Sequence, residues 1–182
     1  MELTQAYLKE CFDYDPATGN LIWKERPWSH FGSEYAFGNS RRWVGRVAGT
    51  VLINGYIHIG LDGSKYLAHR VVWFWHKGLF PPHEIDHIDR DPLNNRLENL
   101  RACTTSQNKR GRRMPNSSGF RGVRRTPQGA WRAGIWIDGR RHNLGVFPTA
   151  KAAGIAYARA AVDHFGAFAP TESKELFNEA YP

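Results

Sequence analysis

Residues 84–110 read EIDHIDRDPLNNRLENLRACTTSQNKR, and this stretch decides how the chain is interpreted. Asp86 and His87 are adjacent, and they are followed at ordered spacing by Asn99 and Asn108. One imidazole, one carboxylate and two carboxamides therefore occur within a short segment. Such a set can activate a water molecule and hold a hard divalent cation beside a phosphate.

Local patterning places this set on two strands and a helix. We expect strands over 83–88 and 95–100, followed by a helix that Thr104 caps and Gln107 supports through a capping box. Asn108 then lies about one turn into the helix. Two strands that fold back bring the polar set together, although adjacent strand residues share one site only near a strand end or a strong twist.

Each member of the set has a distinct chemical capacity. The oxygen atoms of Asp86 and Asn108 suit Mg²⁺ or Mn²⁺, with water and phosphate completing the coordination. An imidazole titrates near neutral pH, so His87 can accept a proton from water. Asn99 has no proton to exchange usefully, and we expect it to hold the His-bearing strand or ring in register by hydrogen bonds.

Plainer interpretations of these residues exist. An Asp-His pair can be an ordinary surface pair, and an asparagine before a basic stretch can be a turn residue or a cap. His83, Asp89 and Asp91 are near rivals for the same roles, but they fall outside the spacing.

Composition indicates a globular protein with one ordinary domain or two small ones. The 182 residues are 41% hydrophobic and include seven Trp, ten Phe and seven Tyr, enough to bury a core. The two cysteines, Cys11 and Cys103, form no C-x-x-C pair, which argues against a thiolate zinc site or a disulfide framework. The N-terminus is not a signal peptide, and the longest apolar stretch, near 71–75, is too short to span a membrane. We therefore expect a cytoplasmic protein with no membrane partner.

Positive charge is concentrated in one block. The net charge is +8, and no acidic residue occurs between Glu98 and Asp138, while the rest of the chain is close to neutral. This block predicts a nucleic-acid partner, against the alternative of a merely soluble basic surface. Its nine basic residues are Arg101, Lys109, Arg110, Arg112, Arg113, Arg121, Arg124, Arg125 and Arg132.

The first hundred residues predict β-hairpins and helices around an aromatic core. We expect a helix over 1–12 capped by Thr4, a turn at 15–20 before a strand at 21–23, and a loop over 26–42. Strands are expected over 44–52, 56–61 and 66–68, separated by Asn54-Gly55 and Asp62-Gly63. A helix over 69–76 should end at Gly78.

After the basic connector 111–118 the pattern changes to three strands over 119–147 and an Ala-rich helix over 149–165, capped by Thr149 and Gly166. Strand alternation directs Leu144 and Val146 toward this helix. It leaves an outer face of Arg124, Arg132, Trp136, Arg141 and Asn143. Three arginines, a tryptophan and an asparagine on an exposed sheet suit docking on a DNA duplex, although an ordinary polar sheet face is the alternative.

Residues 82–110 resemble the HNH endonuclease motif, the ββα-metal nuclease site, in the subgroup common in phages and introns. The resemblance implies that His87 is the general base, that Asn99 is a structural aid, and that Asp86 and Asn108 bind the metal. Asn108 stands where many members have histidine, which implies a hard cation rather than zinc. The segment 67–70 also resembles that subgroup, and we expect a core or hinge role for His69.

Residues 118–171 resemble the AP2 domain of plant transcription factors. The similarity rests on the segments 119–124, 131–133, 144–147, 149–150 and 156–157. It implies a three-stranded sheet laid in the major groove, with contacts from Arg121, Arg124, Arg141 and Asn143. The chain departs from plant members at Thr126, Gln128, Gly134 and Trp136, so the plant target sequence does not carry over.

Together these features predict an α+β chain with a β-hairpin-rich HNH nuclease module over 1–110, a linker over 111–118, an AP2 domain over 119–171 and a tail over 172–182. We expect a homing-type enzyme that nicks or cleaves double-stranded DNA as a monomer inside a phage-infected bacterium. It would use one Mg²⁺ or Mn²⁺ and no small-molecule cofactor.

The DNA-binding residues would be Arg121, Arg124, Arg132, Trp136, Arg141, Asn143, Lys109, Arg110, Arg112 and Arg113. The alternative function is that of a non-catalytic DNA-binding regulator with a decayed HNH fold. The presence of all four polar residues, from Asp86 to Asn108, argues against it.

Overall fold

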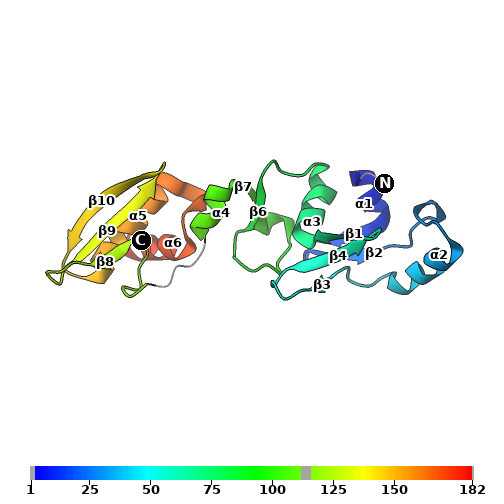
Figure 1. Cartoon of the computed structure of the whole chain (residues 1–182), viewed down its shortest axis with the longest axis horizontal. Coiled ribbons are helices and arrows are strands. Elements are labelled where there is room, and N and C mark those ends of the chain that lie inside the picture. Colours follow the sequence, from blue (N-terminus) through cyan, green and yellow to red (C-terminus); the bar gives the residue numbers. More distant parts are fainter. Residues whose placement is uncertain (1–2, 112–115, 182) are drawn as a thin grey trace. The chain divides into compact units, whose positions relative to one another are not determined.

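The computed structural model describes residues 3–111 and 116–181 (Figure 1). The chain divides into two compact units, Met1–Thr104 and Thr105–Pro182. The predicted connector at 111–118 falls partly on 112–115, outside the described residues, and the predicted domain limits stay a prediction. The second unit begins with the short helix that follows Thr104, which the sequence placed in the first domain.

The first unit is built from small antiparallel sheets and helices. Its elements are α1 (Gln5–Cys11), β1 (Phe12–Asp15), β2 (Asn20–Trp23), η1 (Trp28–His30), α2 (Glu34–Ser40), η2 (Arg41–Trp43), β3 (Thr50–Val51), β4 (Ile57–Leu61), β5 (Ser64–Leu67), α3 (Ala68–Lys77), β6 (Glu84–His87), η3 (Leu97–Asn99) and β7 (Leu100–Cys103). The sheets are β1-β2, β3-β4-β5 and β6-β7. Leu8, Phe12, Ile59, Val71 and Val72 are fully buried at the centre.

Several local predictions for this unit are confirmed. Thr4 caps α1, because its hydroxyl accepts a hydrogen bond from the Tyr7 amide at 3.1 Å. The helix predicted over 69–76 is α3, and it ends at Gly78, whose φ of 73° is a left-handed conformation that glycine adopts without strain.

Three local predictions for this unit are wrong. The strand predicted over 44–52 is confined to β3, Thr50–Val51, because residues 44–49 form a turn and a single bridge at Val47. The segment 26–42 is not a plain loop, because it contains α2, which Ser33 caps by accepting a hydrogen bond from the Ala36 amide. The strand predicted over 95–100 instead covers Leu100–Cys103, since residues 97–99 form a 3-10 turn that takes the place of its expected start.

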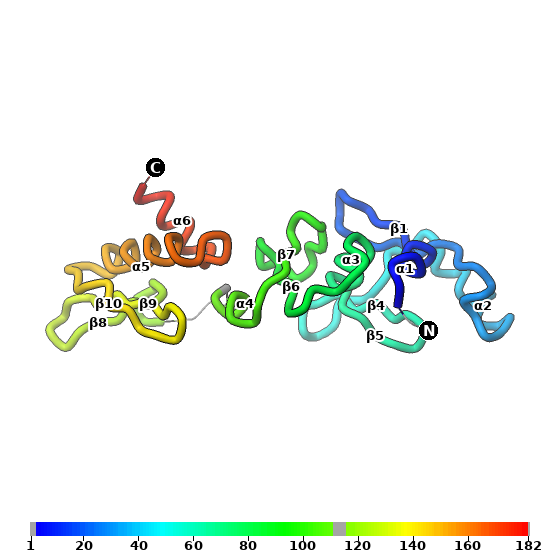
Figure 2. The backbone as a smooth tube through the Cα atoms, turned by 90° about the horizontal axis from the view of Figure 1, so that it is seen from above, coloured from blue at the N-terminus to red at the C-terminus, as the bar shows by residue number. Residues whose placement is uncertain are grey.

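The second unit packs a three-stranded sheet on one long helix. Its elements are α4 (Thr105–Gly111), β8 (Val123–Arg125), β9 (Trp131–Ile137), β10 (Arg140–Phe147), α5 (Ala150–Phe165), η4 (Gly166–Phe168) and α6 (Thr171–Ala180). The strand order is β10-β9-β8, all antiparallel. Figure 2 shows α5 along the sheet and α6 beside α5. The predicted tail over 172–182 is therefore largely a helix.

Small residues let α5 lie close to the sheet. Ala153 and Ala161 are fully buried, together with Ala133 and Ile135 of β9. A Cβ on Gly154 would approach the Phe120 ring to 2.6 Å, so only glycine fits there. This packing confirms the prediction that the Ala-rich helix covers one face of the three strands.

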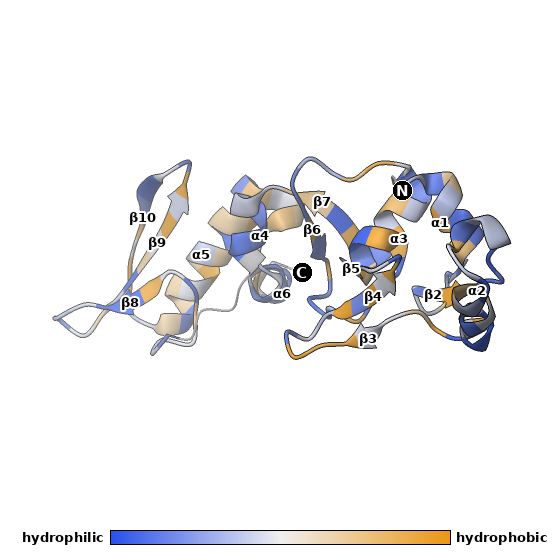
Figure 3. Cartoon of the chain, turned by 45° about the vertical axis from the view of Figure 1, so that its right-hand side comes forward, coloured by the Kyte–Doolittle hydropathy of each residue, from blue (hydrophilic) through white to orange (hydrophobic). Residues whose placement is uncertain are grey.

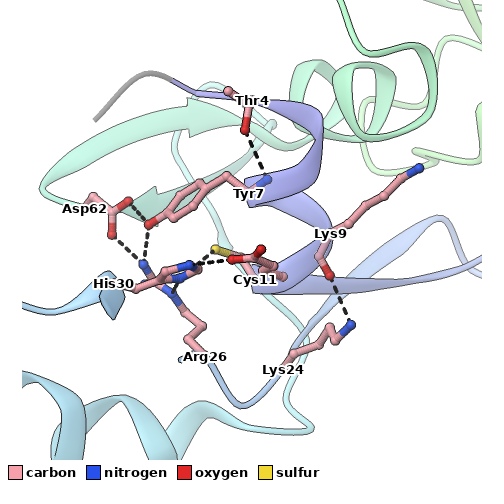
Figure 4. Close-up of polar contacts among 9 residues, drawn as sticks. Thr4, Tyr7, Lys9, Cys11, Lys24, Arg26, His30 and Asp62 are labelled. Atoms are coloured by element: carbon pink, nitrogen blue, oxygen red, sulfur yellow. Dashed lines mark hydrogen bonds and ion pairs between the residues drawn. The ribbon is translucent and has the colours of Figure 1, made fainter. Parts of the chain in front are cut away.

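A buried polar network ties the first helix of the chain to distant segments (Figure 4). The guanidinium of Arg26 donates to the Tyr7 hydroxyl, to Asp62 Oδ1 at 2.8 Å and to His30 Nδ1 at 3.2 Å. The Tyr7 hydroxyl donates to Asp62, and His30 Nε2 contacts Glu10 at 2.7 Å. Because a buried charge is costly unless it is paired, Arg26 fixes the 24–31 segment against α1 and the β4–β5 turn.

Cys11 lies inside this network rather than in a reactive site. Its sulfur is 3.9 Å from His30 Nδ1, and its side chain is fully buried. Burial raises the pKa of the Cys11 thiol to about 11, so the thiol stays protonated at neutral pH.

Candidate active site

The hairpin of β6 and β7 carries the predicted reactive pair. Asp86 pairs with Arg101 and His87 with Leu100 across the two strands. Ile85 and His87 are buried, whereas Asp86 is only half-buried. The two side chains thus leave opposite faces of the hairpin, as strand alternation requires, but His87 is the last residue of β6, and adjacent residues can still line one site at a strand end.

The His87 ring is oriented by a residue that sequence reasoning did not select. His87 Nε2 lies 3.0 Å from the side-chain oxygen of Asn95, and the two residues are only 6% and 2% exposed. An amide oxygen can only accept a hydrogen bond, so Nε2 carries the proton and donates it. The lone pair of the neutral ring then lies on Nδ1, and that atom can receive a proton.

Asn99 holds the loop between His87 and Asn95. Its amide nitrogen donates to Asp89 Oδ1 at 2.9 Å and to the Asn94 carbonyl at 2.8 Å, while its amide oxygen accepts from the Asp89 amide at 3.0 Å. Its backbone carbonyl also accepts from the Ile88 amide at 2.9 Å. Asn99 therefore acts on His87 through the loop that carries Asn95.

Asp89 closes the same loop. Partial desolvation raises its pKa, but hydrogen bonds from the Asp91 amide and from the side chains of Asn94 and Asn99 outweigh that effect and hold the pKa below its ordinary value. The carboxylate of Asp89 is thus ionised at neutral pH and bound to its own loop, which distinguishes it from a general base.

The β1–β2 turn supports the loop from behind. The Leu97 amide donates to the Tyr14 hydroxyl at 2.9 Å, and Arg96 Nε donates to the Ala17 carbonyl at 2.6 Å. Gly19 has a φ of 77°, and a Cβ there would lie 2.3 Å from the Arg96 nitrogen. Only glycine lets this turn approach the backbone next to Asn95.

Aromatic rings enclose His87. The His69 ring centroid is 5.1 Å from that of His87 in an edge-to-face arrangement, and the Tyr56 centroid is 5.5 Å from His69 and 6.1 Å from His87. Burial, with smaller contributions from His87, Arg70 and His58, lowers the pKa of His69 to about 3. His69 is a neutral ring in the wall of the site, which agrees with the expected core role.

This shift predicts a stability that depends on pH. Unfolded His69 binds a proton below pH 6.5, whereas folded His69 stays neutral down to about pH 3. The free energy of unfolding therefore falls as pH decreases from 6.5 toward 3, by up to about 1.4 kcal/mol per pH unit. Urea denaturation at pH 7 and pH 5 should show a smaller loss for His69→Gln than for the wild type. Equal losses in the two proteins would contradict the assignment.

Asp86 is paired with Arg101. Arg101 donates to Asp86 Oδ2 from Nε at 2.9 Å and from Nη2 at 2.6 Å. Both bonds end on Oδ2, so Oδ1 is the oxygen that could ligate a cation. A carboxylate oxygen and an amide oxygen fit a hard divalent cation that keeps several waters.

That Asp86 and Asn108 bind the same metal ion stays a prediction. Asn108 lies on α4 of the second unit, whereas Asp86 lies in the first. Within residues 3–111 and 116–181, no group of three or more His, Cys, Asp and Glu side chains is arranged to hold a metal ion. A site of one carboxylate, one amide and water molecules would not form such a group.

The exposed face of the second unit carries paired arginines. Arg124 of β8 lies directly opposite Arg132 of β9, and both are exposed. Arg141 lies opposite Trp136, with its guanidinium over Gly134. Like charges directly opposite each other destabilise a sheet, and an anion that binds between them removes this cost.

The edge strand departs from the predicted alternation. A register shift between Asn143 and Gly145 places Val146 opposite Arg132, so Val146 is 53% exposed instead of facing the helix. The prediction for Val146 is wrong because a β-bulge adds one residue to β10. Leu144 does pack in the core, and Asn143 is exposed, as predicted.

Other predicted DNA contacts lie elsewhere. Arg121 Nε donates to Glu172 of α6 at 3.3 Å, so the structure does not bring it to the exposed face. The Arg110 guanidinium lies 4.2 Å from the Phe165 ring centroid, and Lys109 is exposed on α4. Arg112 and Arg113 lie outside the described residues.

A comparison with protein families matches the segment that carries the candidate site. Residues 66–110 match a family model described as HNH endonuclease. The matched segment is similar to an HNH endonuclease domain. The HNH match runs from the end of β5 through α3 and both strands of the β6–β7 hairpin into α4.

Two curated relatives are similar to part of the chain. An uncharacterized HNH endonuclease of Acanthamoeba polyphaga mimivirus is 35% identical over 85 residues, which cover 47% of this chain and 44% of that protein. Protein 3.8 of Escherichia phage T7 is 35% identical over 80 residues, which cover 42% of this chain and 66% of that protein. The chain thus spans between 44% and 66% of the length of these relatives. No solved structure matches the chain.

Among the described residues, none of the helices is long and apolar enough to cross a membrane.

Proposed function

We propose that this chain is a metal-dependent HNH DNA endonuclease in which His87 is the general base. The observation that carries the proposal is the hydrogen bond from His87 Nε2 to Asn95, which leaves Nδ1 as the proton acceptor. The HNH match over 66–110 supports DNA as the substrate.

In this mechanism His87 Nδ1 takes a proton from the water that attacks the scissile phosphate. Asn95 keeps the ring in the required tautomer, and Asn99 keeps the loop of Asn95 in place. Asp86 and Asn108 are the residues we assign to hold one Mg²⁺ or Mn²⁺. Such a cation would stabilise charge on the phosphoryl oxygens and on the leaving 3′ oxygen.

Metal removal tests the proposal. The full chain should convert supercoiled plasmid to the nicked form with Mg²⁺ or Mn²⁺, and EDTA should stop the conversion. One catalytic set in each chain predicts that a monomer makes nicks before any linear product appears. A protein that binds DNA tightly but never cuts it, with either metal, would favour the rival, a non-catalytic regulator.

We further propose that residues 118–171 form an AP2-type DNA-binding domain that targets the nuclease to a specific site. The three-stranded sheet on one helix and the Arg124–Arg132 pair on its exposed face support this role. Homing-type specificity is part of the same proposal, and the viral and phage relatives are consistent with it.

Arg124→Ala should weaken DNA binding with little change in folding. Loss of one phosphate contact should lower the slope of log K against log salt by about 0.9. Fluorescence anisotropy with a mixed-sequence duplex at several salt concentrations measures both effects. Arg159→Ala is the matched control, because Arg159 is an exposed arginine on α5 of the same unit. Equal slopes for the wild type and Arg124→Ala would contradict the assignment of this face.

A further inference from the structure

A run of exposed apolar side chains lies on the segment that leads from η2 to the β3–β4 turn. Figure 3 shows hydrophobic residues along β3 and this turn. The run consists of Trp43, Val44, Val47, Val51, Leu52 and Ile53. Ile53 is fully exposed, and β3 is the edge strand of its sheet. Large apolar side chains left exposed along a strand edge are typical of a surface that binds a partner.

The turn holds Ile53 outward in a defined conformation. The Gly55 amide donates to the Leu52 carbonyl at 2.8 Å, and the Leu52 amide donates to the Tyr56 carbonyl at 3.0 Å. The Asn54 side chain accepts from the Tyr56 amide at 3.1 Å. We refer to residues 52–55 as the hairpin tip. Because these bonds close the hairpin tip, Ile53 cannot fold back to cover itself.

The hairpin tip lies beside the candidate active site. A Cβ on Gly55 would be 3.8 Å from Pro92, in the loop that follows His87. Tyr56, the next residue, contacts the His87 ring. The ends of a four-residue turn are less than about 7 Å apart, and bases stack about 3.4 Å apart along a strand. Ile53 therefore lies within a few base steps of a phosphate bound at His87.

The charge of the segment around these apolar residues favours a polyanion as the partner. No acidic residue occurs between Glu34 and Asp62. The guanidiniums of Arg42 and Arg46 lie 5.1 and 6.0 Å from the Trp43 ring centroid, and neither has a carboxylate within ion-pair distance among the described residues. A symmetric pair of chains meeting at this edge would bring four such arginines together, which disfavours a second copy as the occupant.

We propose that Ile53 and Leu52 enter the minor groove and wedge between base pairs next to the scissile phosphate, while Arg42 and Arg46 contact flanking phosphates. Apolar wedges of this kind unstack a base step and kink the duplex. The kink would present the backbone to His87. This inference rests on the proposed nuclease function, because DNA is its partner.

The test compares Leu52→Ala/Ile53→Ala with the wild type and with Leu79→Ala. Leu79 is also an exposed apolar residue, and it lies before the start of β6, at the end of that strand away from His87, so it is the control. Mixed-sequence duplexes carrying 2-aminopurine report unstacking in EDTA, where no cleavage occurs. We expect the wild type and Leu79→Ala to raise the fluorescence and the double variant not to do so. With Mg²⁺, the double variant should nick plasmid about tenfold more slowly.

The fluorescence measurement in EDTA tests the wedge, and the nicking assay with Mg²⁺ tests the nuclease, so the two proposals can fail separately. Unstacking that the double variant loses supports the wedge even if the wild type does not cut DNA. Equal fluorescence and equal nicking in all three proteins would overturn the wedge and leave the nuclease assignment intact. A wild type that is dimeric by size-exclusion chromatography, with a monomeric double variant, would also overturn it, because the edge would then be a contact between copies.

Discussion

Replacement of His87 by alanine should lower the rate of plasmid nicking by about 10²- to 10⁴-fold, the usual contribution of a general base. The reason is that Nδ1 is the proton acceptor that the Asn95 hydrogen bond leaves available. DNA binding should stay close to the wild-type value, since the positive charge lies in other residues. Single-turnover nicking of supercoiled plasmid with Mg²⁺ measures the effect.

Two further variants separate the loss of the base from loss of structure. His87→Gln keeps a side-chain amide that can donate to Asn95 but has no basic nitrogen, so it should be as slow as His87→Ala. His83→Ala removes the exposed histidine closest in sequence to the pair and should nick at the wild-type rate. Nicking that survives in both His87 variants, with His83→Ala impaired, would transfer the role of base to His83.

Asn95→Leu should lower the nicking rate by about 10- to 100-fold. Leucine is similar in size but accepts no hydrogen bond, so Nε2 loses its partner and the ring is no longer confined to one tautomer. In the other tautomer the proton lies on Nδ1, and that atom can no longer take a proton from water. Melting temperature and duplex affinity serve as controls for folding and binding.

The pH profile distinguishes positioning from simple packing. In Asn95→Asp the carboxylate still accepts a hydrogen bond from His87 Nε2. Its negative charge also stabilises the protonated ring. Because the base acts in its neutral form, the rise of the nicking rate with pH should shift to higher pH. Activity should recover above that shift, whereas Asn95→Leu stays slow at every pH. Nicking by Asn95→Leu at the wild-type rate would show that Asn95 only fills space.

Much of the fold was predictable because short-range patterns determine it. The Thr4 and Thr149 caps, the end of α3 at Gly78 and the three strands before an Ala-rich helix follow from capping chemistry and alternation. Two of the mistakes arose where the backbone departs from regular periodicity. The 3-10 turn at 97–99 displaced a strand, and a bulge at 143–145 turned Val146 outward.

The sequence drew attention to three members of the candidate site, whose roles stay a prediction, but not to the residues that support His87. Asp86, His87 and Asn99 attract attention because few structural roles need them at that spacing. Asn95 and Gly19 do not, since an asparagine in a polar loop and a glycine in a turn are common. Two adjacent asparagines, Asn94 and Asn95, were the only hint in the sequence that the loop uses its amides.

The sequence by itself determined the chemical groups that this protein can use, because residue identity alone supplies an imidazole, a carboxylate, carboxamides and a block of arginines. Only the tertiary structure decided which atom of each group is engaged. His87 is hydrogen-bonded to Asn95, eight residues along the chain. Arg96, the residue after Asn95, donates a hydrogen bond to the carbonyl of Ala17, 79 residues away. Such partners depend on how distant segments pack, and no local pattern encodes that packing.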